Sequence, residues 1–521
     1  MNRLFLYSGL FFILILIFDA YDRDYNQSAN NVNQTTDVEQ SSNQTKTLPP
    51  EGDIKSPLKL KPKTTALVIS NLENDKLVIK IDSSNGEVVY AELKEYSTKL
   101  GSKEKVVLLD YVNKAYTAGS NIQALDINTK PVFNVLNRSA DSLTLISQNV
   151  KNLEFQKSIK LKKGAHQLVV TNKITNNGAE NIFVRNYETI SRSGNFATNI
   201  MLPTFTGAAF YDEENKFLKI GFDEILEDES TYNTDSSWIS MIEHYFFTAW
   251  LPSGETKKTI YTSHDESIYT IGSTTDYESL GPGQSLVFSS VMFVGPKLQA
   301  EISPLAQGLD LTVDYGVLTF LAAPLFWIMD SINFLVDNWG VSIILLTFLI
   351  KALFFKLSET SYRSMAQMKK LNPRMQALKE RYADDKKKFS EALMRMYKEE
   401  KVNPLGGCLP ILIQIPVFIA LYWVLVESIE IRHAPFFGWI QDLSSADPLF
   451  ILPIAMGISM YIQQKLNPAP TDATQQKIFL FLPFIFTALF ATFPAGLVLY
   501  WLTNNILSIA QQYVINKRIV G

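Results

Sequence analysis

The sequence predicts a two-part chain: an all-β domain in the first half and a helical membrane domain in the second, with six spans when an apolar run at the N-terminus is counted. Two observations predict this division. Up to about Pro304 the chain is polar, with short runs of β-branched and aliphatic residues between turn signals. From Val317 to Val514 it is dominated by long apolar runs rich in Phe, Leu and Ile. At 521 residues the chain also exceeds the usual size of one domain.

Composition excludes several classes of function. The net charge of -4 is too small to indicate a nucleic-acid partner. The single cysteine, Cys408, allows no intramolecular disulfide. No GxxxxGK[ST], HExxH or CxxC motif is present, and the four histidines are scattered without ligand spacing. We therefore expect no cofactor and no metal, and neither a nucleotide-driven pump nor a metalloenzyme.

The N-terminal segment carries a targeting signal. The apolar run from Leu4 to Phe18 follows Arg3, and its length fits either the core of a signal peptide or a short anchor. We expect an uncleaved membrane anchor over residues 1–20. Residues 21–57 are rich in Asn, Gln, Ser and Thr, and they cannot bury enough apolar surface to offset chain entropy. We therefore predict a disordered periplasmic linker there.

Residues 58–305 are predicted to form a large β-sandwich. Leu77–Ile81, Ser142–Ile146 and His166–Thr171 are examples of its short strand-forming runs, and turn pairs such as Asn85-Gly86 and Pro282-Gly283 separate them. Many short strands at this spacing, with no helical repeat, are typical of sandwiches.

The helical half begins with a segment that differs from the rest. Pro324 and Asp330 interrupt its apolar run, so residues 306–337 are predicted to form an amphipathic helix at the membrane interface. Residues 338–521 are predicted to form the membrane core. Its spans are expected at about 338–356, 408–427, 449–463, 478–493 and 497–515.

Charge asymmetry predicts how these spans are oriented. The segment between the second and third of the six spans carries about 13 Lys or Arg against about 7 Asp or Glu, which is typical of a cytoplasmic loop. The loop from Glu427 to Pro448 holds several carboxylates and one basic residue, Arg432, so it is expected outside. Both termini are then cytoplasmic and the β domain is periplasmic.

Polar residues inside the predicted spans are the candidate functional residues. Lys351 lies in the second span, where an ionisable side chain is costly and marks a functional candidate. It could instead extend its ammonium group to the cytoplasmic headgroups. Other polar or amphipathic residues could either hold helices together or line a wet cavity; we predict a groove. They are Thr347, Gln414, Tyr500, Trp501, Asn504 and Asn505.

Residues 358–403 are predicted to form a cytoplasmic helical hairpin. Apolar residues recur at three-to-four spacing on both arms, and Asp384 and Asp385 lie at the expected turn. They could form a seam between the two arms, or an adaptable surface for apolar segments. The candidate contact residues are Met365, Met368, Met375, Met394 and Met396. The basic excess of the hairpin could be a solvated face, or it could contact ribosomal RNA or lipid headgroups.

Two long motifs resemble those of the YidC/Oxa/Alb insertase family, in its Gram-negative form with a large periplasmic domain. They run from Tyr397 to Pro410 (YKEEKVNPLGGCLP) and from Phe493 to Trp501 (FPAGLVLYW). The resemblance implies a five-helix insertase core and a periplasmic β-supersandwich. It also implies a positively charged groove holding Lys351, with Thr347, Gln414, Tyr500 and Trp501 along its wall. Implied partners are nascent membrane proteins, the Sec translocon, the ribosome and the signal recognition pathway, for a protein that is possibly monomeric.

The sequence departs from the family at two places. The family usually has arginine where this chain has Lys351, and lysine keeps the charge but loses the bidentate fork. The tail stops at Gly521, shortly after the last span, whereas relatives with long basic tails can bind ribosomes through them.

The function expected from the residues and the resemblance together is that of an inner-membrane insertase and chaperone, not an enzyme. It would work alone or with the Sec translocon and without nucleotide hydrolysis. Two other functions would explain part of the sequence. A solute transporter would be expected to show paired repeats with interrupted helices. A periplasmic sugar-binding or epimerase-like enzyme on an anchor would not explain polar groups in the spans.

Overall fold

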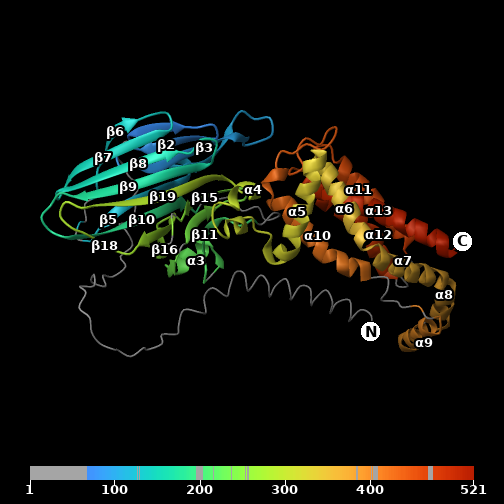
Figure 1. The fold of residues 1–521 in the computed structure, drawn as a ribbon. Helices are drawn as coiled ribbons and strands as arrows, with labels where there is room; N and C mark the ends of the chain where they lie inside the picture. The colour runs from blue at the N-terminus through green and yellow to red at the C-terminus, as the bar shows by residue number, and fades with distance from the viewer. Residues whose placement is uncertain are drawn as a thin grey trace, which may run out of the picture. The chain divides into compact units, whose positions relative to one another are not determined.

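The computed structural model describes residues 67–520 apart from 126, 128–129, 195–203, 215, 236, 253, 255–256, 383–384, 401, 403–408 and 468–472. The predicted anchor at 1–20 and linker at 21–57 lie outside the described residues. A β domain comes first in the chain and a helical bundle follows it, and both belong to one compact unit (Figure 1).

Two antiparallel sheets form the β domain. The ten-stranded sheet contains, in spatial order, β1 (Ile69–Glu73), β2 (Leu77–Asp82), β3 (Glu87–Ser97), β5 (Thr117–Ala124), β10 (Ile182–Ser193), β17 (Ile268–Thr275), β16 (Lys257–Asp265) and β13 (Thr231–Asp235), with β4 (Lys105–Asp110) beside β3 and β18 (Glu278–Leu280) beside β10. The nine-stranded sheet contains β12 (Lys216–Ile220), β11 (Gly207–Asp212), β14 (Trp238–Ile242), β15 (Phe246–Leu251), β19 (Ser285–Pro296), β9 (Gln167–Asn176), β8 (Leu153–Leu161), β7 (Ser142–Val150) and β6 (Asn134–Arg138). The predicted β-sandwich is confirmed.

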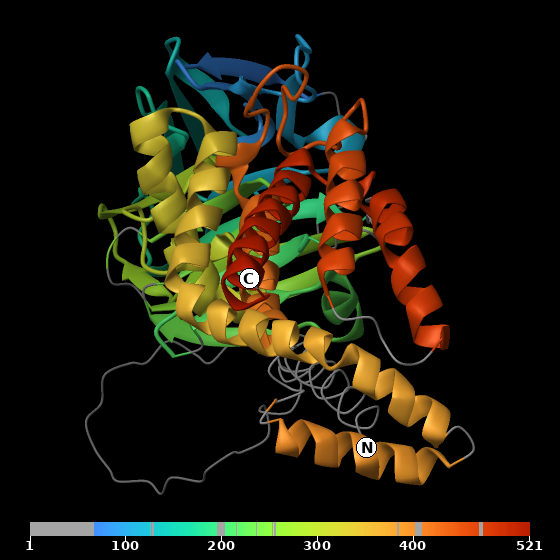
Figure 2. The same cartoon turned by 90° about the vertical axis from the view of Figure 1, so that its right-hand side faces the viewer.

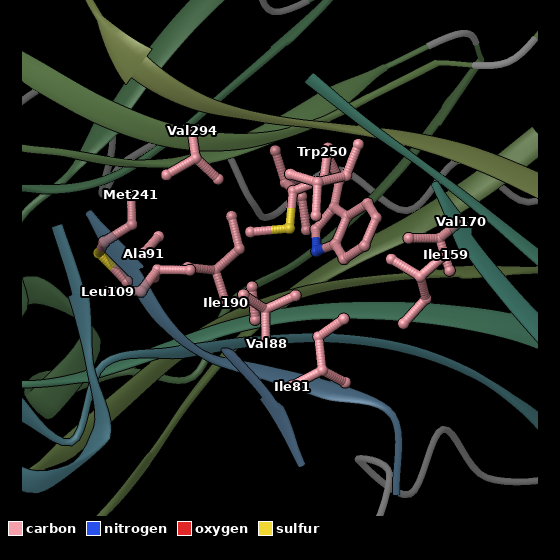
Figure 3. Packing of buried hydrophobic residues seen from close by; sticks show 14 of the residues in the cluster. Ile81, Val88, Ala91, Leu109, Ile159, Val170, Ile190, Met241, Trp250 and Val294 are labelled. Atoms are coloured by element: carbon pink, nitrogen blue, oxygen red, sulfur yellow. The ribbon is translucent and has the colours of Figure 1, made fainter. Parts of the chain in front are cut away.

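Alternation along the strands produces the sandwich core. In β8 every second side chain is buried, and β9 shows the same period over most of its length. Ile159 and Val170 of one sheet and Val88 and Ile190 of the other belong to one apolar cluster (Figure 3). Burial of one face of each sheet is what fixes the strand register.

One inward position of β8 holds a lysine. Lys157 is fully buried, and its ammonium group donates to the Ser120 carbonyl oxygen of the opposite sheet at 2.5 Å. The carbonyl oxygens of Asn85 and Gly86 lie 3.4 Å away. Burial lowers the pKa of Lys157 to about 7. The lysine thus connects the two sheets by a hydrogen bond, although burying its amino group disfavours the charged form.

Lys157 should make stability depend on pH. The unfolded chain keeps this proton up to the ordinary lysine pKa of 10.5, whereas the folded protein releases it near 7. Between these values the unfolded state binds more protons, so stability should rise with pH. Thermal unfolding of wild type and Lys157→Met, followed from pH 6 to 10, should show a steeper rise for wild type. Parallel curves would contradict this prediction.

The helical half contains nine α-helices from Thr319 onward in the part of the chain described. They are α5 (Thr319–Val336), α6 (Trp339–Leu353), α7 (Phe355–Lys370), α8 (Asn372–Arg381), α9 (Lys386–Glu399), α10 (Leu409–Glu427), α11 (Ile451–Leu466), α12 (Ala473–Phe490) and α13 (Ala495–Val520) (Figure 2). The last helix, α13, contacts α6, α7, α10 and α11, so it is the centre of the bundle.

A helix occupies each of the five spans predicted for the core. That these helices cross a bilayer stays a prediction. Among the described helices, one segment is long and apolar enough to cross a membrane on its own. It is Gly316–Val336, which contains the predicted interfacial helix α5. The bent pair α6 and α7, with 69° between them, would make a second span.

The predicted hairpin of two helices is made of three. α7 ends at Lys370, and α8 begins with Asn372 and Pro373. Proline fits the first turn of a helix but cannot donate a backbone hydrogen bond, which explains a break at this point. α8 and α9 then pack together around Leu371, Met375 and Met396.

Short elements connect the β domain to the end of α10. They are α4 (Gln299–Ile302), η2 (Leu309–Thr312) and η5 (Ile429–Ile431). The Lys297 ammonium lies 3.8 Å from the Glu427 carboxylate, with both side chains buried. Burial lowers the pKa of His244 to about 4, so its neutral ring can donate from Nε2 to the Val426 carbonyl oxygen at 2.9 Å. Arg432 donates to the Ser97 carbonyl oxygen at 2.6 Å.

Candidate functional site

Lys351 lies near the C-terminal end of the apolar helix α6. Its ammonium group donates to Ser508 Oγ of α13 at 2.8 Å and lies 3.5 Å from Gln414 Oε1 of α10. The side chain is only partly buried, and polar groups from two other helices surround its charge. An ionisable group inside an apolar bundle needs such partners. The structure thus places Lys351 in a polar junction between α6, α10 and α13.

Gln414 continues this network on its other side. Its amide Nε2 donates to Asn504 Oδ1, one helical turn before Ser508 on α13. Ser508 Oγ in turn donates to the Asn504 carbonyl oxygen at 2.7 Å. Lys351, Gln414, Asn504 and Ser508 therefore form one hydrogen-bonded cluster at three helices.

A cavity of about 380 Å³ opens beside this cluster, between α10, α11, α12 and α13. Its polar lining consists mostly of uncharged amides, and its apolar lining includes several aromatic rings. The lining residues are Gln414, Ile415, Phe418, Met460, Gln463, Gln464, Asn467, Phe479, Leu482, Pro483, Tyr500, Trp501, Asn504 and Asn505. Of the residues predicted for the groove, five line this cavity.

Lys351 does not line the large cavity. It belongs to a separate hollow of about 30 Å³, together with Ile350, Phe354, Leu357, Ser358 and Val417. Gln414 lines both spaces. The amide of Gln414 therefore stands next to the lysine on one side and next to the larger cavity on the other.

Two further polar pairs connect α13 to α11. Asn505 Nδ2 donates to Ser459 Oγ at 3.0 Å, and Gln512 Nε2 donates to Asn467 Oδ1 at 3.0 Å. Asn505 is buried. These pairs are contacts between helices, and Asn467 and Asn505 also line the cavity.

Aromatic rings form the apolar wall of the cavity. The Trp501 ring centroid lies 4.6 Å from that of Phe418 and 4.9 Å from that of Phe490. Tyr500 is buried, and its ring centroid lies 6.1 Å from that of Phe418. The cavity thus presents amides and aromatic faces, which suit an extended chain carrying both polar and apolar groups.

Thr347 is the predicted groove residue that the structure keeps apart. Its side chain is buried, and its hydroxyl donates to the Ile343 carbonyl oxygen at 2.6 Å within α6. It lines neither hollow. A threonine satisfied by its own helix is a structural element of α6 in this arrangement.

The five candidate methionines of the hairpin differ in burial. Met375 and Met396 are buried in the seam between α8 and α9, and Met368 packs against that seam. Met365 is partly buried, whereas Met394 is 47% exposed. Most of the set therefore holds the hairpin together.

Sequence reasoning missed Ser508, whose hydroxyl lies 2.8 Å from the Lys351 ammonium. A signal was present, because Asn504, Ser508 and Gln512 recur at intervals of four on one face of the last helix. The cavity residues from α11, Gln463, Gln464 and Asn467, were also missed. They lie at the end of an apolar run, where polar side chains are expected without any special role.

Comparisons with known proteins cover almost the whole chain. Residues 331–521 match the family model of the 60Kd inner membrane protein, and residues 70–328 match that of the YidC periplasmic domain. The chain is 40% identical to the membrane protein insertase YidC of Methylobacillus flagellatus, over 99% of this chain and 97% of the relative. It is 40% identical to that of a Marinomonas strain, over 99% of both chains, and 39% identical to that of Haemophilus influenzae, over 99% and 97%.

Solved structures show weaker similarity. A crystal structure of an active YidC insertase with its first transmembrane domain resolved has a TM-score of 0.40 and 17% identity, covering 86% of this chain and 94% of that one. A galactose mutarotase related enzyme from Lactobacillus acidophilus has a TM-score of 0.32 and 10% identity, covering 44% and 97%. Neither similarity supports an argument about function.

Proposed function

The chain belongs to the YidC family of membrane protein insertases, and we propose that it receives the hydrophilic flank of a substrate in the cavity between α10, α11, α12 and α13. Its relatives are inner-membrane insertases and not enzymes, and they act on nascent membrane proteins. The route that a substrate takes through this chain is the subject of the proposal.

The observation that carries the proposal is a mostly apolar cavity among apolar helices that is also lined by six amide side chains. Its amides offer hydrogen-bond donors and acceptors to a chain that is leaving water, which reduces the desolvation cost of peptide groups. Phe418 and Trp501 offer aromatic surface to the adjoining apolar segment. Lys351 supplies positive charge on the far side of Gln414, held by Ser508. The proposed groove therefore combines an uncharged cavity with the positive charge of Lys351 beside it.

The energy source and partners are part of the same proposal. The sequence contains no phosphate-binding loop, so burial of the apolar segment in lipid would drive insertion without nucleotide hydrolysis. Work with the Sec translocon, the ribosome and the signal recognition pathway is expected from the family resemblance. The exposed basic residues of the hairpin, such as Lys387, Arg395 and Lys398, would suit ribosomal RNA or anionic lipid.

The proposed orientation follows from charge. The basic hairpin and both termini would face the cytoplasm, and the β domain would face the periplasm. The cavity and Lys351 would then lie toward the cytoplasmic half of the bundle, because α6 ends at Leu353 and leads directly into α7. A flank arriving from the cytoplasm would meet them first.

Insertion into proteoliposomes containing this protein alone tests the proposal. We expect a short phage-coat-type substrate to insert, as protease protection of its flank would show. Lys351→Arg should keep most of this activity, whereas Lys351→Met should lower the rate about tenfold, which corresponds to about 1.4 kcal/mol of barrier. The reason is that methionine keeps the volume near Ser508 and Gln414 but removes the charge.

Lys356→Met is the matched control. It removes the same charge one turn further along the chain, at an exposed position of α7, and should leave the rate unchanged. Equal insertion by wild type and both methionine variants would show that Lys351 has no part in the groove. No insertion by folded wild type would count against autonomous function and favour dependence on the Sec translocon.

A further inference from the structure

The loop between α10 and α11 exposes large apolar side chains. Phe437 is 78% exposed, Leu449 56% and Phe450 51%, and Trp439 is also exposed. No charged residue occurs from Ala434 to Gln441 or from Pro448 to Gln464. An exposed apolar cluster whose own residues carry no charge marks an interaction surface.

The aromatic turn, residues 436–440, is held by hydrogen bonds to its own backbone and to α6. The Phe436 amide donates to the Ile440 carbonyl oxygen at 3.0 Å, and the Asn338 side chain donates to the Phe436 carbonyl oxygen at 3.0 Å. Gly438 has φ of +60°, a conformation that favours glycine. The Phe436 ring covers Gly340 so closely that an added Cβ there would overlap it. One aromatic side chain therefore anchors the turn while the next, Phe437, points outward.

Trp439 is connected to the beginning of α11. Its indole N–H donates to the Asp447 carboxylate at 3.0 Å. The same buried carboxylate accepts from the backbone amides of Leu449 at 2.9 Å and Leu452 at 2.7 Å. Because the only polar group of the Trp439 side chain is satisfied within the loop, its ring needs no water partner.

The exposed surface continues without interruption into α11. Phe450 precedes the helix with φ of +56°, which is unusual for an aromatic residue and leaves its side chain exposed. The exposed residues of α11 that follow recur at three-to-four spacing and form one apolar stripe. They are Ile451, Ile454, Ile458 and Ile462.

We propose that the aromatic turn, together with Leu449 and Phe450, inserts into the lipid headgroup region at the end of the bundle opposite the hairpin. The proposal rests on the proposed crossing of the bilayer by α10 and α11. The partner is a lipid surface, because the patch is continuous with the apolar stripe of α11 and carries no charge to pair with a protein. Aromatic side chains with one polar tip favour this depth of a membrane.

Insertion of this turn would fix the depth at which the helical bundle lies in the membrane. The turn is bonded to the start of α6 through Asn338 and to the start of α11 through Asp447. The Ser445 carbonyl oxygen also accepts from the Ala495 amide at 2.7 Å, at the start of α13. A loop anchored in the headgroups through this turn would therefore hold three helices at one level.

Spin-label accessibility in proteoliposomes of the full chain tests this. Phe437→Cys, Leu449→Cys and the control Ser445→Cys, each in a Cys408→Ser background, would be labelled with a nitroxide. Ser445 is exposed in the same loop but lies outside the patch. The label at 437 and 449 should collide more with oxygen, which concentrates in lipid, than with a water-soluble nickel chelate. The oxygen-to-nickel ratio should be several-fold higher there than at 445.

Two outcomes would overturn the proposal. A ratio at 437 equal to that at 445 would place the turn in water. Protection of 437 from both reagents would indicate a protein partner or a second copy of this chain. Insertion assayed in the same vesicles separates these outcomes from failure of the proposed cavity, because accessibility at 437 does not depend on substrate transfer.

Discussion

Glu427→Ala is expected to destabilise the folded protein by about 3–5 kcal/mol, because it would leave the Lys297 ammonium buried without its carboxylate partner. The side chains of Lys297 and Glu427 are 1% and 3% exposed, and their charged atoms are 3.8 Å apart. Burial lowers the pKa of Lys297, which shows how much the surroundings disfavour its charge. Urea unfolding in detergent, followed by near-ultraviolet circular dichroism, measures the change.

The double variant Lys297→Met with Glu427→Leu is the control. Replacing both charges by apolar groups of similar volume should recover most of the stability lost in Glu427→Ala. The other charges near Lys297, including Asp314 and Lys219, already form a 2.8 Å pair with each other and remain in place. A double variant as unstable as the single one would show that the unpaired Lys297 charge is not the cause of the instability and that α10 depends on packing at this point.

Much of the fold was predictable because its signals are local. The alternation that buries one face of β8 is visible in Leu153–Leu161, and the apolar runs that become α10 and α11 are visible in the same way. The distribution of the β-strands over two sheets was not predictable, since strand order depends on pairings between distant segments. The three-part hairpin was also missed, although Pro373 carries the signal for its break.

The candidate site was predictable to a similar extent. Gln414 and Asn504 stand out as polar residues in apolar helices, and the structure brings them together. Ser508 did not stand out, because serine is common in helices and its role depends on Lys351 from a helix 157 positions away. Thr347 was predicted from its helical spacing to Lys351 and from the family resemblance, and neither can show that a hydroxyl is satisfied by its own backbone.

The junction around Lys297 and Glu427 had no sequence signal. Lys297 follows a strand and Glu427 ends an apolar helix, 130 positions apart, and each is an ordinary charged residue in its local context. The same is true of His244, whose partner is a backbone carbonyl oxygen of α10. Contacts between domains are decided by tertiary packing, which local patterns do not encode.

Gly457→Leu is expected to lower insertion about tenfold, corresponding to about 1.4 kcal/mol of barrier, because it would push α12 away from α11. A Cβ added at Gly457 would overlap the Thr487 hydroxyl of α12, and Thr487 Cβ would lie 3.2 Å from it. In the described part of the chain α12 packs mainly against α11, and its Phe486 and Phe490 rings also lie against Trp501 of α13. Leu482 and Pro483 of α12 line the proposed substrate cavity, so its wall depends on this close approach.

Ile458→Leu provides the matched comparison, since it places the same side chain one position further along, where the native residue is already 57% exposed. It should insert substrate as wild type does. The pair Gly457→Ala and Thr487→Ala, made together, should restore activity lost by Gly457→Ala alone, because removing the hydroxyl makes room for the new methyl group. Wild-type insertion by Gly457→Leu would mean that α12 can leave α11 without harm, and the cavity wall would then have to be formed by α10, α11 and α13.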